Sequence, residues 1–292
     1  MDTTLLPWID PNKLNVSVLN FNPNAYKYII NNDLVHNTYI ILNPSAFEYT
    51  KNYLLYLITE QNYKYMTMIQ IFVMIDHPGI VDFIEMVGYN KEMFHHMCKN
   101  PHCIKFIEEN KHNYHINWLS LAQNRAAVHL LEKYLYTNGI LNTDILPEVW
   151  QYISLNTSPD AIKLLMRHPE YICWDELSSN PSAIKLLEEN PTKINYWYLP
   201  LNTAAIHLIE ANLSSVNLEN LSRNPNAMHI LEKHQHLIDW FAISENPSIF
   251  QYDYKTLSEK RTNILREELM ATTLHPKRIK YWLDNGLEID DL

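Results

Sequence analysis

The same short text returns along this chain at a spacing of 22 residues. Residues 178–188 read Ser-Ser-Asn-Pro-Ser-Ala-Ile-Lys-Leu-Leu-Glu, and residues 222–232 read Ser-Arg-Asn-Pro-Asn-Ala-Met-His-Ile-Leu-Glu. A fixed short period is typical of proteins built from stacked units, each of which buries its apolar side only against its neighbours. The period therefore predicts an all-α fold: an α-solenoid, a superhelical stack of short helix pairs with repeats of 22–24 residues.

Each repeat opens with a signal for the start of a helix. In Asn180-Pro181 the Asn side chain caps free backbone amides, and the proline takes the first helical position, where its missing N–H costs nothing. Helices this short are not stable alone in water, so we expect stacking to hold them. Five core columns are predicted. The first helix contributes a small residue (Ala161, Ala183, Ala205 and Ala227) and then an apolar one (Ile162, Ile184, Ile206, Met228 and Phe250). The second helix contributes Ile172, Ile194, Val216 and Ile238; Trp174, Tyr196, Leu218 and Trp240; and Leu177, Leu199, Leu221 and Ile243.

The clarity of the repeat divides the chain into three parts. Residues 1–92 hold divergent copies, and residues 51–92 lose the period, which predicts longer helices there. Residues 93–250 form the regular array, with an insertion near 136–147. Residues 251–292 lose the period again and predict a C-terminal helical cap, because a terminal repeat must present a polar outer face.

Composition argues against several classes of function. The four glycines are far apart, which excludes Gly-rich phosphate loops, and the net charge of -10 disfavours a general nucleic-acid binder. Three cysteines without a pairing pattern indicate a reducing compartment. The N-terminus lacks the pattern of a signal peptide, and the most apolar stretch, residues 66–75, is too short to span a bilayer. We therefore expect an intracellular protein.

Residues 95–103 carry two histidines and two cysteines, which superficially resembles a zinc site. Aligned to the repeat, Cys103 takes the position of Ala183, and Cys98 takes the position of Ser178. Both are positions for small residues, so we interpret the cysteines as structural. No catalytic constellation stands apart from the repeat, and we predict no metal, no cofactor and no enzymatic activity.

A column of lysine and histidine recurs on the first helix, and a glutamate follows three residues later in most repeats. Pairs at this spacing meet on one helix face, so the simplest interpretation is a solvated surface. The functional alternative is a partner-binding strip, whose histidines would make binding pH-sensitive. The column consists of Lys105, His129, Lys163, Lys185, His207 and His229.

Two further groups of residues allow a binding role. Aromatic residues at Trp174, Tyr196, Trp197, Tyr198 and Trp240 could stack on bases, but their spacing favours core packing, with Tyr198 pointing outward. The cations Lys277, Arg278 and Lys280 crowd the first turn of a C-terminal helix, against the helix dipole. They either meet acidic groups such as Glu288, Asp290 and Asp291 or bind an external anion.

The string from Leu177 to Pro191 resembles the Asn-Pro repeat proteins of the giant DNA viruses of amoebae and algae, mimivirus-like viruses among them. Residues 274–286 are similar to a C-terminal element that follows such repeats. The abundance of Asn, Ile, Lys and Tyr fits an A/T-rich viral genome. This resemblance implies a helical repeat array and no activity. A more distant likeness to leucine-rich-variant repeats supports a superhelical ribbon only.

We therefore expect a non-catalytic viral repeat protein that acts as a protein–protein interaction or scaffold module. Its partner would be a viral or host protein, with no membrane, in the host cytoplasm or the virion. The alternatives are a helical solenoid that binds nucleic acid through a local basic strip, and a structural component of the virion.

Overall fold

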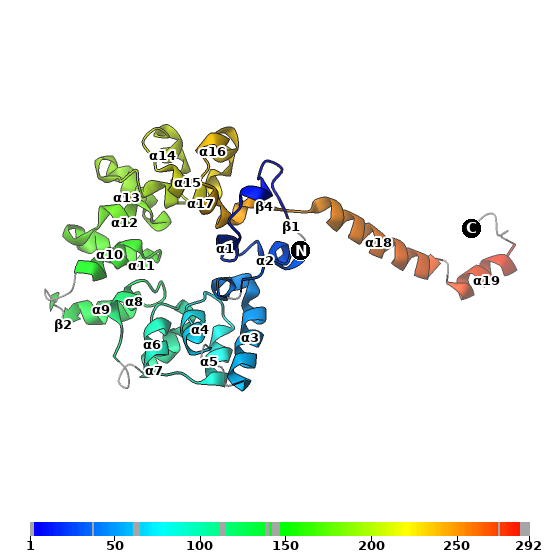
Figure 1. Ribbon diagram of the computed structural model, residues 1–292, viewed down its shortest axis with the longest axis horizontal. Coiled ribbons are helices and arrows are strands. Elements are labelled where there is room, and N and C mark those ends of the chain that lie inside the picture. Colours follow the sequence, from blue (N-terminus) through cyan, green and yellow to red (C-terminus); the bar gives the residue numbers. More distant parts are fainter. Residues whose placement is uncertain are drawn as a thin grey trace. The chain divides into compact units, whose positions relative to one another are not determined.

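The computed structural model describes residues 3–36, 38–60, 65–110, 115–137, 140–141, 147–273 and 275–286. It is mostly helical, which confirms the predicted all-α character. Contacts divide the chain into two compact parts: residues 6–249, which we call the array, and residues 1–5 with 250–292, which we call the terminal part. Figure 1 shows the helices of both parts in the order of the chain.

The helices of the array are short. Several begin with a single 3-10 turn opened by proline, as at Pro181–Ala183 and Pro225–Ala227. The α-helices are α1 (Val16–Leu19), α2 (Tyr26–Asn31), α3 (Phe47–Thr59), α4 (Tyr65–Phe72), α5 (Ile80–Val87), α6 (Lys91–Met97), α7 (Ile104–Asn110), α8 (Trp118–Ala122), α9 (Val128–Leu135), α10 (Pro147–Leu155), α11 (Pro159–Arg167), α12 (Trp174–Ser178), α13 (Ile184–Glu189), α14 (Ile206–Ala211), α15 (Leu218–Arg223), α16 (Met228–Lys233) and α17 (Trp240–Ser244). The longest, α3, overlaps the stretch 51–92 for which longer helices are predicted, but α4 and α5 in that stretch are no longer than α10 and α11 of the regular array.

The predicted insertion near 136–147 begins with two short strands. β2 (Tyr136–Thr137) pairs antiparallel with β3 (Ile140–Leu141), and α10 begins at Pro147. The rest of the insertion, residues 138–139 and 142–146, lies outside the described residues.

A row of buried asparagines organises the array, and we call it the asparagine ladder. In Asn202 the side-chain Oδ1 accepts a hydrogen bond from the backbone N–H of Ala204 at 3.0 Å. Its Nδ2 donates to the backbone carbonyls of Ser178, at 3.1 Å, and Asn180, at 2.9 Å. The same three kinds of bond recur at each ladder residue, so that every buried amide is satisfied. The ladder consists of Asn22, Asn43, Asn100, Asn124, Asn156, Asn180, Asn202, Asn224 and Asn246.

Each ladder asparagine after Asn22 binds the segment that precedes it in the chain, and we call the segment that begins at a ladder asparagine a unit. The sequence predicts only the capping bond, in which Oδ1 accepts from the second amide of the unit. The two bonds donated by Nδ2 are additional, and they tie each unit to its predecessor. Asn202 is followed by Thr203 instead of proline and still makes all three bonds. The asparagine, rather than the proline, therefore defines the unit.

The ladder also joins the first unit of the array to the last. Asn22 Nδ2 donates to the carbonyls of Ser244, at 3.1 Å, and Asn246, at 2.8 Å. The backbone N–H of Asn15 donates to Ser244 Oγ at 2.9 Å, as the corresponding amides do between later units. α1 accordingly lies beside α17 (Figure 1). The first unit thus contacts the last as if it were the next one in the series.

This contact differs from the capped, open stack expected from the sequence. The terminal part is helical, as predicted, with α18 (Tyr254–Thr273) and α19 (Pro276–Asp284), and β1 (Thr3–Leu5) pairs antiparallel with β4 (Phe250–Tyr252). However, the carbonyls of the last unit that a cap would cover accept hydrogen bonds from Asn22. The divergent N-terminal units keep the ladder asparagine, and Asn22 binds the last unit through it.

Two of the predicted core columns are confirmed. The small column at Ala161, Ala183, Ala205 and Ala227 is buried, and so is the aliphatic column at Leu177, Leu199, Leu221 and Ile243. The aromatic column is only half-buried, at Trp174, Tyr196, Leu218 and Trp240.

Aromatic rings replace the ladder in the described part of residues 44–99, where no side chain makes the full set of ladder bonds. Phe47 stacks on His77 with ring centroids 4.0 Å apart and on Phe72 at 5.1 Å. Phe72 in turn meets the edge of Phe83 at 5.0 Å. His77 keeps one feature of a ladder residue, because its Nδ1 accepts a hydrogen bond from the N–H of Gly79.

Candidate interaction surface

The predicted lysine and histidine strip lies on the exposed face of the first helices. Its histidines bind glutamates: His129 Nε2 lies 2.9 Å from Glu108 Oε1, and the same distance separates the pairs His207–Glu188 and His229–Glu210. Each of these pairs joins one unit to the preceding one.

The prediction that each histidine of the strip pairs with the glutamate three residues later in its own helix is therefore wrong. The imidazole reaches across the gap between adjacent helices, which brings the glutamate of the previous unit closer than the one three residues away. The lysines of the strip behave differently. Lys163 contacts Asp160 at 2.8 Å, and Lys105 lies 4.0 Å from Glu109, each within one helix. Because its histidines are engaged between units, the strip contributes to cohesion and offers few unpaired groups to a partner.

The two cysteines of the zinc-like segment occupy the small positions assigned to them. Cys103 and Cys98 are fully buried, and the backbone N–H of Asn117 binds the Cys98 sulfur, as the amide of Asn195 binds Ser178. Burial raises the pKa of Cys103 to about 12, so its thiol stays protonated near neutral pH. Among the residues that the structure describes, no three His, Cys, Asp or Glu side chains gather as metal ligands would.

The aromatic residues do not pack as predicted. None of Trp174, Tyr196, Trp197, Tyr198 and Trp240 is buried, and Trp197 (61% exposed) is more open than Tyr198 (36%), which was expected to point outward. The second segment of each unit is so short that its first residues lie at the edge of the stack, where a large ring cannot be enclosed.

These edge positions form a row that alternates acidic and aromatic side chains. In α12, α15 and α17 the second residue is exposed, and Trp197 holds the same position in a turn. α15 lies beside α17 and beside the turn at Leu199–Leu201, which places Glu219 between Trp197 and Phe241. The row, spaced at 22 residues, is Asp175, Trp197, Glu219 and Phe241, and we call it the acid–aromatic row.

Hydrogen bonds fix the backbone beneath the row. Asn220 Nδ2 donates to the carbonyl of Trp197 at 2.7 Å, and Asn195 Nδ2 donates to Asp175 Oδ1, also at 2.7 Å. Phe241 is 52% exposed. Exposed Trp and Phe on a rigid frame are residues that dominate the energy of protein interfaces, because they bury a large area at little entropic cost. The sequence places these residues at a common spacing, and this regularity is the signal that could have identified them.

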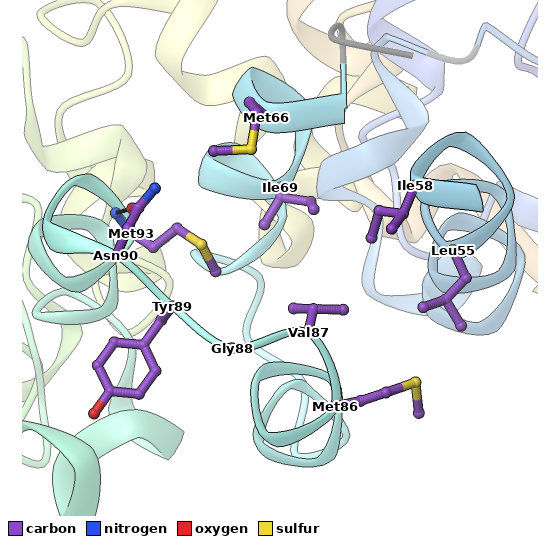
Figure 2. Close-up of a pocket in the computed structure, with 10 residues that line it drawn as sticks. All are labelled: Leu55, Ile58, Met66, Ile69, Met86, Val87, Gly88, Tyr89, Asn90 and Met93. Carbon is purple, nitrogen blue, oxygen red and sulfur yellow. Dashed lines mark hydrogen bonds between the residues drawn. The ribbon is translucent and has the colours of Figure 1, made fainter. Parts of the chain in front are cut away.

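A separate apolar pocket of about 580 Å³ lies in the part of the array without the ladder. Figure 2 shows side chains from α3, α4, α5 and α6 around it, including three methionines. Its polar lining is limited to Tyr89, Asn90 and the backbone of Gly88, and Asn90 Oδ1 already accepts from the N–H of Met93. Such a pocket can accept an apolar side chain, and methionines adapt to several shapes. Among the described residues that line it, no ionisable side chains converge as they do in a catalytic site.

The C-terminal cations lie on α19 and are exposed. The Arg278 guanidinium sits over the Trp282 ring at 5.4 Å and donates to the carbonyl of Thr272 at 3.3 Å. Lys277 N–H donates to His275 Nδ1, which caps the helix. The acidic neighbours considered for these cations, Glu288, Asp290 and Asp291, lie outside the described residues.

No protein-family model, no curated protein and no solved structure matches this chain. In the part of the chain that the structure describes, no helix combines the length and the apolar character needed to cross a membrane.

Proposed function

We propose that residues 6–249 form a closed solenoid of repeated helix pairs that acts as a non-catalytic protein-interaction or scaffold module. The observation that carries this proposal is the acid–aromatic row. It offers two exposed aromatic anchors with a carboxylate between them and a second carboxylate beside them. The complementary partner is a protein segment in which apolar and basic side chains alternate.

The charges of the row favour a protein over a nucleic acid. Aromatic rings that bind single strands are accompanied by cations that neutralise phosphates. Here Asp175 and Glu219 occupy the positions between and beside the rings, where they would repel a phosphate backbone. The cation Arg223 is itself paired with Glu219, at 2.8 Å, and with Glu245, at 3.3 Å.

The viral origin of the protein, and its place in the host cytoplasm or the virion, belong to the same proposal. They rest on the resemblance of residues 177–191 to the Asn-Pro repeat proteins. A role as a structural virion component would appear as a high copy number in purified particles.

Affinity purification of the full chain from infected cells, with and without nuclease, tests the proposal. We expect protein partners that survive nuclease with the wild type and are lost with a Trp197→Ala, Phe241→Ala double variant. A matched control is Tyr56→Ala, since Tyr56 is 58% exposed on α3, outside the row. Partners that disappear on nuclease treatment would support nucleic-acid binding instead, and equal capture by the double variant would contradict a role for the row.

A further inference from the structure

α18 is the longest helix that the structure describes, with 20 residues, and every side chain described along it is exposed. The apolar Ile264 is 56% exposed, and Leu265 is 54% exposed. A helix with no packed face depends on its own hydrogen bonds, which is marginal in water at about 20 residues. α18 therefore gains stability from any partner that covers these side chains.

One face of α18 carries a symmetric arrangement of charge. Arg261, Ile264, Leu265 and Glu268 are spaced at i, i+3, i+4 and i+7, which places them on one side of the helix. The cation lies three residues before the apolar pair, and the anion lies three residues after it. Within the described residues, neither Arg261 nor Glu268 takes part in an ion pair.

We propose that this face binds α18 of a second copy of the chain in antiparallel orientation, with the two-fold axis between Ile264 and Leu265. In that register Arg261 of each copy lies level with Glu268 of the other, so one contact provides two ion pairs. The apolar pairs meet at the centre. The same patch serves both partners, as two-fold symmetry requires.

The charge pattern distinguishes this partner from the alternatives. A parallel pair would place Arg261 beside Arg261 and Glu268 beside Glu268, which opposes association. A partner other than a second copy would not need cation and anion at equal distances from the apolar centre. A helix of this length is only about 30 Å long, so the contact is small and we expect a dimer that dissociates on dilution.

Sedimentation velocity of the full chain over a range of concentrations tests the proposal. We expect dimers in the wild type, and the single variants Arg261→Glu and Glu268→Arg should each weaken dimerisation at least about tenfold, because like charges then face each other. The double variant that carries both changes restores opposite charges and should recover dimerisation. A chain that is monomeric at every concentration, or a double variant weaker than both single variants, would overturn the proposal.

Disulfide trapping tests the orientation. Copies carrying Arg261→Cys are mixed with copies carrying Glu268→Cys, and the antiparallel register predicts that the mixed pair cross-links faster than either variant with itself. The native thiols interfere little, since Cys98 and Cys103 are buried and the pKa of Cys173 is raised to about 11. Preferential self-linking of each variant would show a parallel pair and contradict the proposal.

Discussion

The units from Asn100 to Asn246 and the described part of residues 44–99 solve the same packing problem in different ways. In the first region an asparagine fixes each unit to the one before it through two hydrogen bonds and caps its own unit through a third. In the second, the contact between Phe47, Phe72 and Phe83 replaces those bonds. The apolar pocket is found in the second region.

The difference shows what the ladder contributes. Hydrogen bonds from a buried amide are directional, so each unit meets its neighbour at one spacing and one register. Ring contacts accept a range of angles, as the stacked and edge-on pairs of Phe72 illustrate. The hydrogen bonds of the ladder therefore give a regular, closely packed surface. The aromatic ring contacts leave room for a cavity.

The largest effect is expected from breaking the ladder in the regular region. Asn202→Ala leaves the Ser178 carbonyl and the Ala204 amide without partners and removes one of the two hydrogen bonds to the Asn180 carbonyl, which should lower the free energy of unfolding by about 3 kcal/mol. Urea unfolding followed by circular dichroism measures the change. Asn212→Ala is the matched control, because the Asn212 amide bonds only within its own helix, and should cost less than about 1 kcal/mol.

The same substitution at the junction between the first and last units should be almost as severe. Asn22 makes the same three bonds as Asn202, so Asn22→Ala is expected to lower the free energy of unfolding by a similar amount, again about 3 kcal/mol. Urea unfolding under the same conditions provides the comparison. A loss of only a few tenths of a kcal/mol would mean that the first unit contributes little to the fold and that the array behaves as an open stack.

Thiol labelling can compare local opening in the two regions. Cys103 lies in the turn Pro101–Cys103 of the unit that begins at Asn100, which contacts α5 of the aromatic region, whereas Ala183→Cys places a thiol at the same position between two ladder units. If the ladder holds its units more tightly than ring contacts do, Cys103 should react with a thiol reagent at least about tenfold faster, equivalent to about 1.4 kcal/mol in opening free energy. Equal rates, measured with Cys98 and Cys173 replaced by serine, would show that both regions open to the same extent.

The smallest effect concerns an ion pair that links the two regions. Asp76 Oδ2 lies 2.7 Å from Arg125 Nη1, and hydrogen bonding from Arg125 lowers the pKa of Asp76 despite opposing burial. A carboxyl whose pKa is lower in the folded chain stabilises it above the unfolded pKa, and this contribution is lost as pH falls below about 4. Because both side chains are about half exposed, this ion pair contributes less than about 1 kcal/mol to the free energy of unfolding. The stability difference between wild type and Asp76→Asn should therefore shrink from pH 7 to pH 3, and a difference that is constant with pH would contradict this role.

Much of the array could be predicted from the sequence, because the features that determine it are local. Asn180-Pro181 specifies a cap and a helix start, and the column of Ala183 specifies close approach. The bonds from Asn202 Nδ2 could not be predicted in this way, since they reach carbonyls 22 and 24 residues earlier whose position depends on the stacking itself.

The candidate surface was less predictable for a related reason. A spacing of 22 residues shows that Trp197 and Phe241 are equivalent, but it does not show whether the position faces the core. The exposure of these residues follows from the shortness of the second segment, which only the folded chain displays. The histidine pairs also depend on distances between units, and so the sequence suggested the wrong glutamate for His207.

The contact between Asn22 and Asn246 has a consequence for how such a chain can change its length. An open stack gains or loses a unit at either end without disturbing the others, whereas the closed solenoid that we propose holds a fixed number of units. A duplicated segment of 22 residues would require a new angle at every junction. Extra residues can be accepted only between ladder positions, as between Asn124 and Asn156, which lie 32 residues apart. We therefore expect natural length variation to occur at such places, with the number of units unchanged.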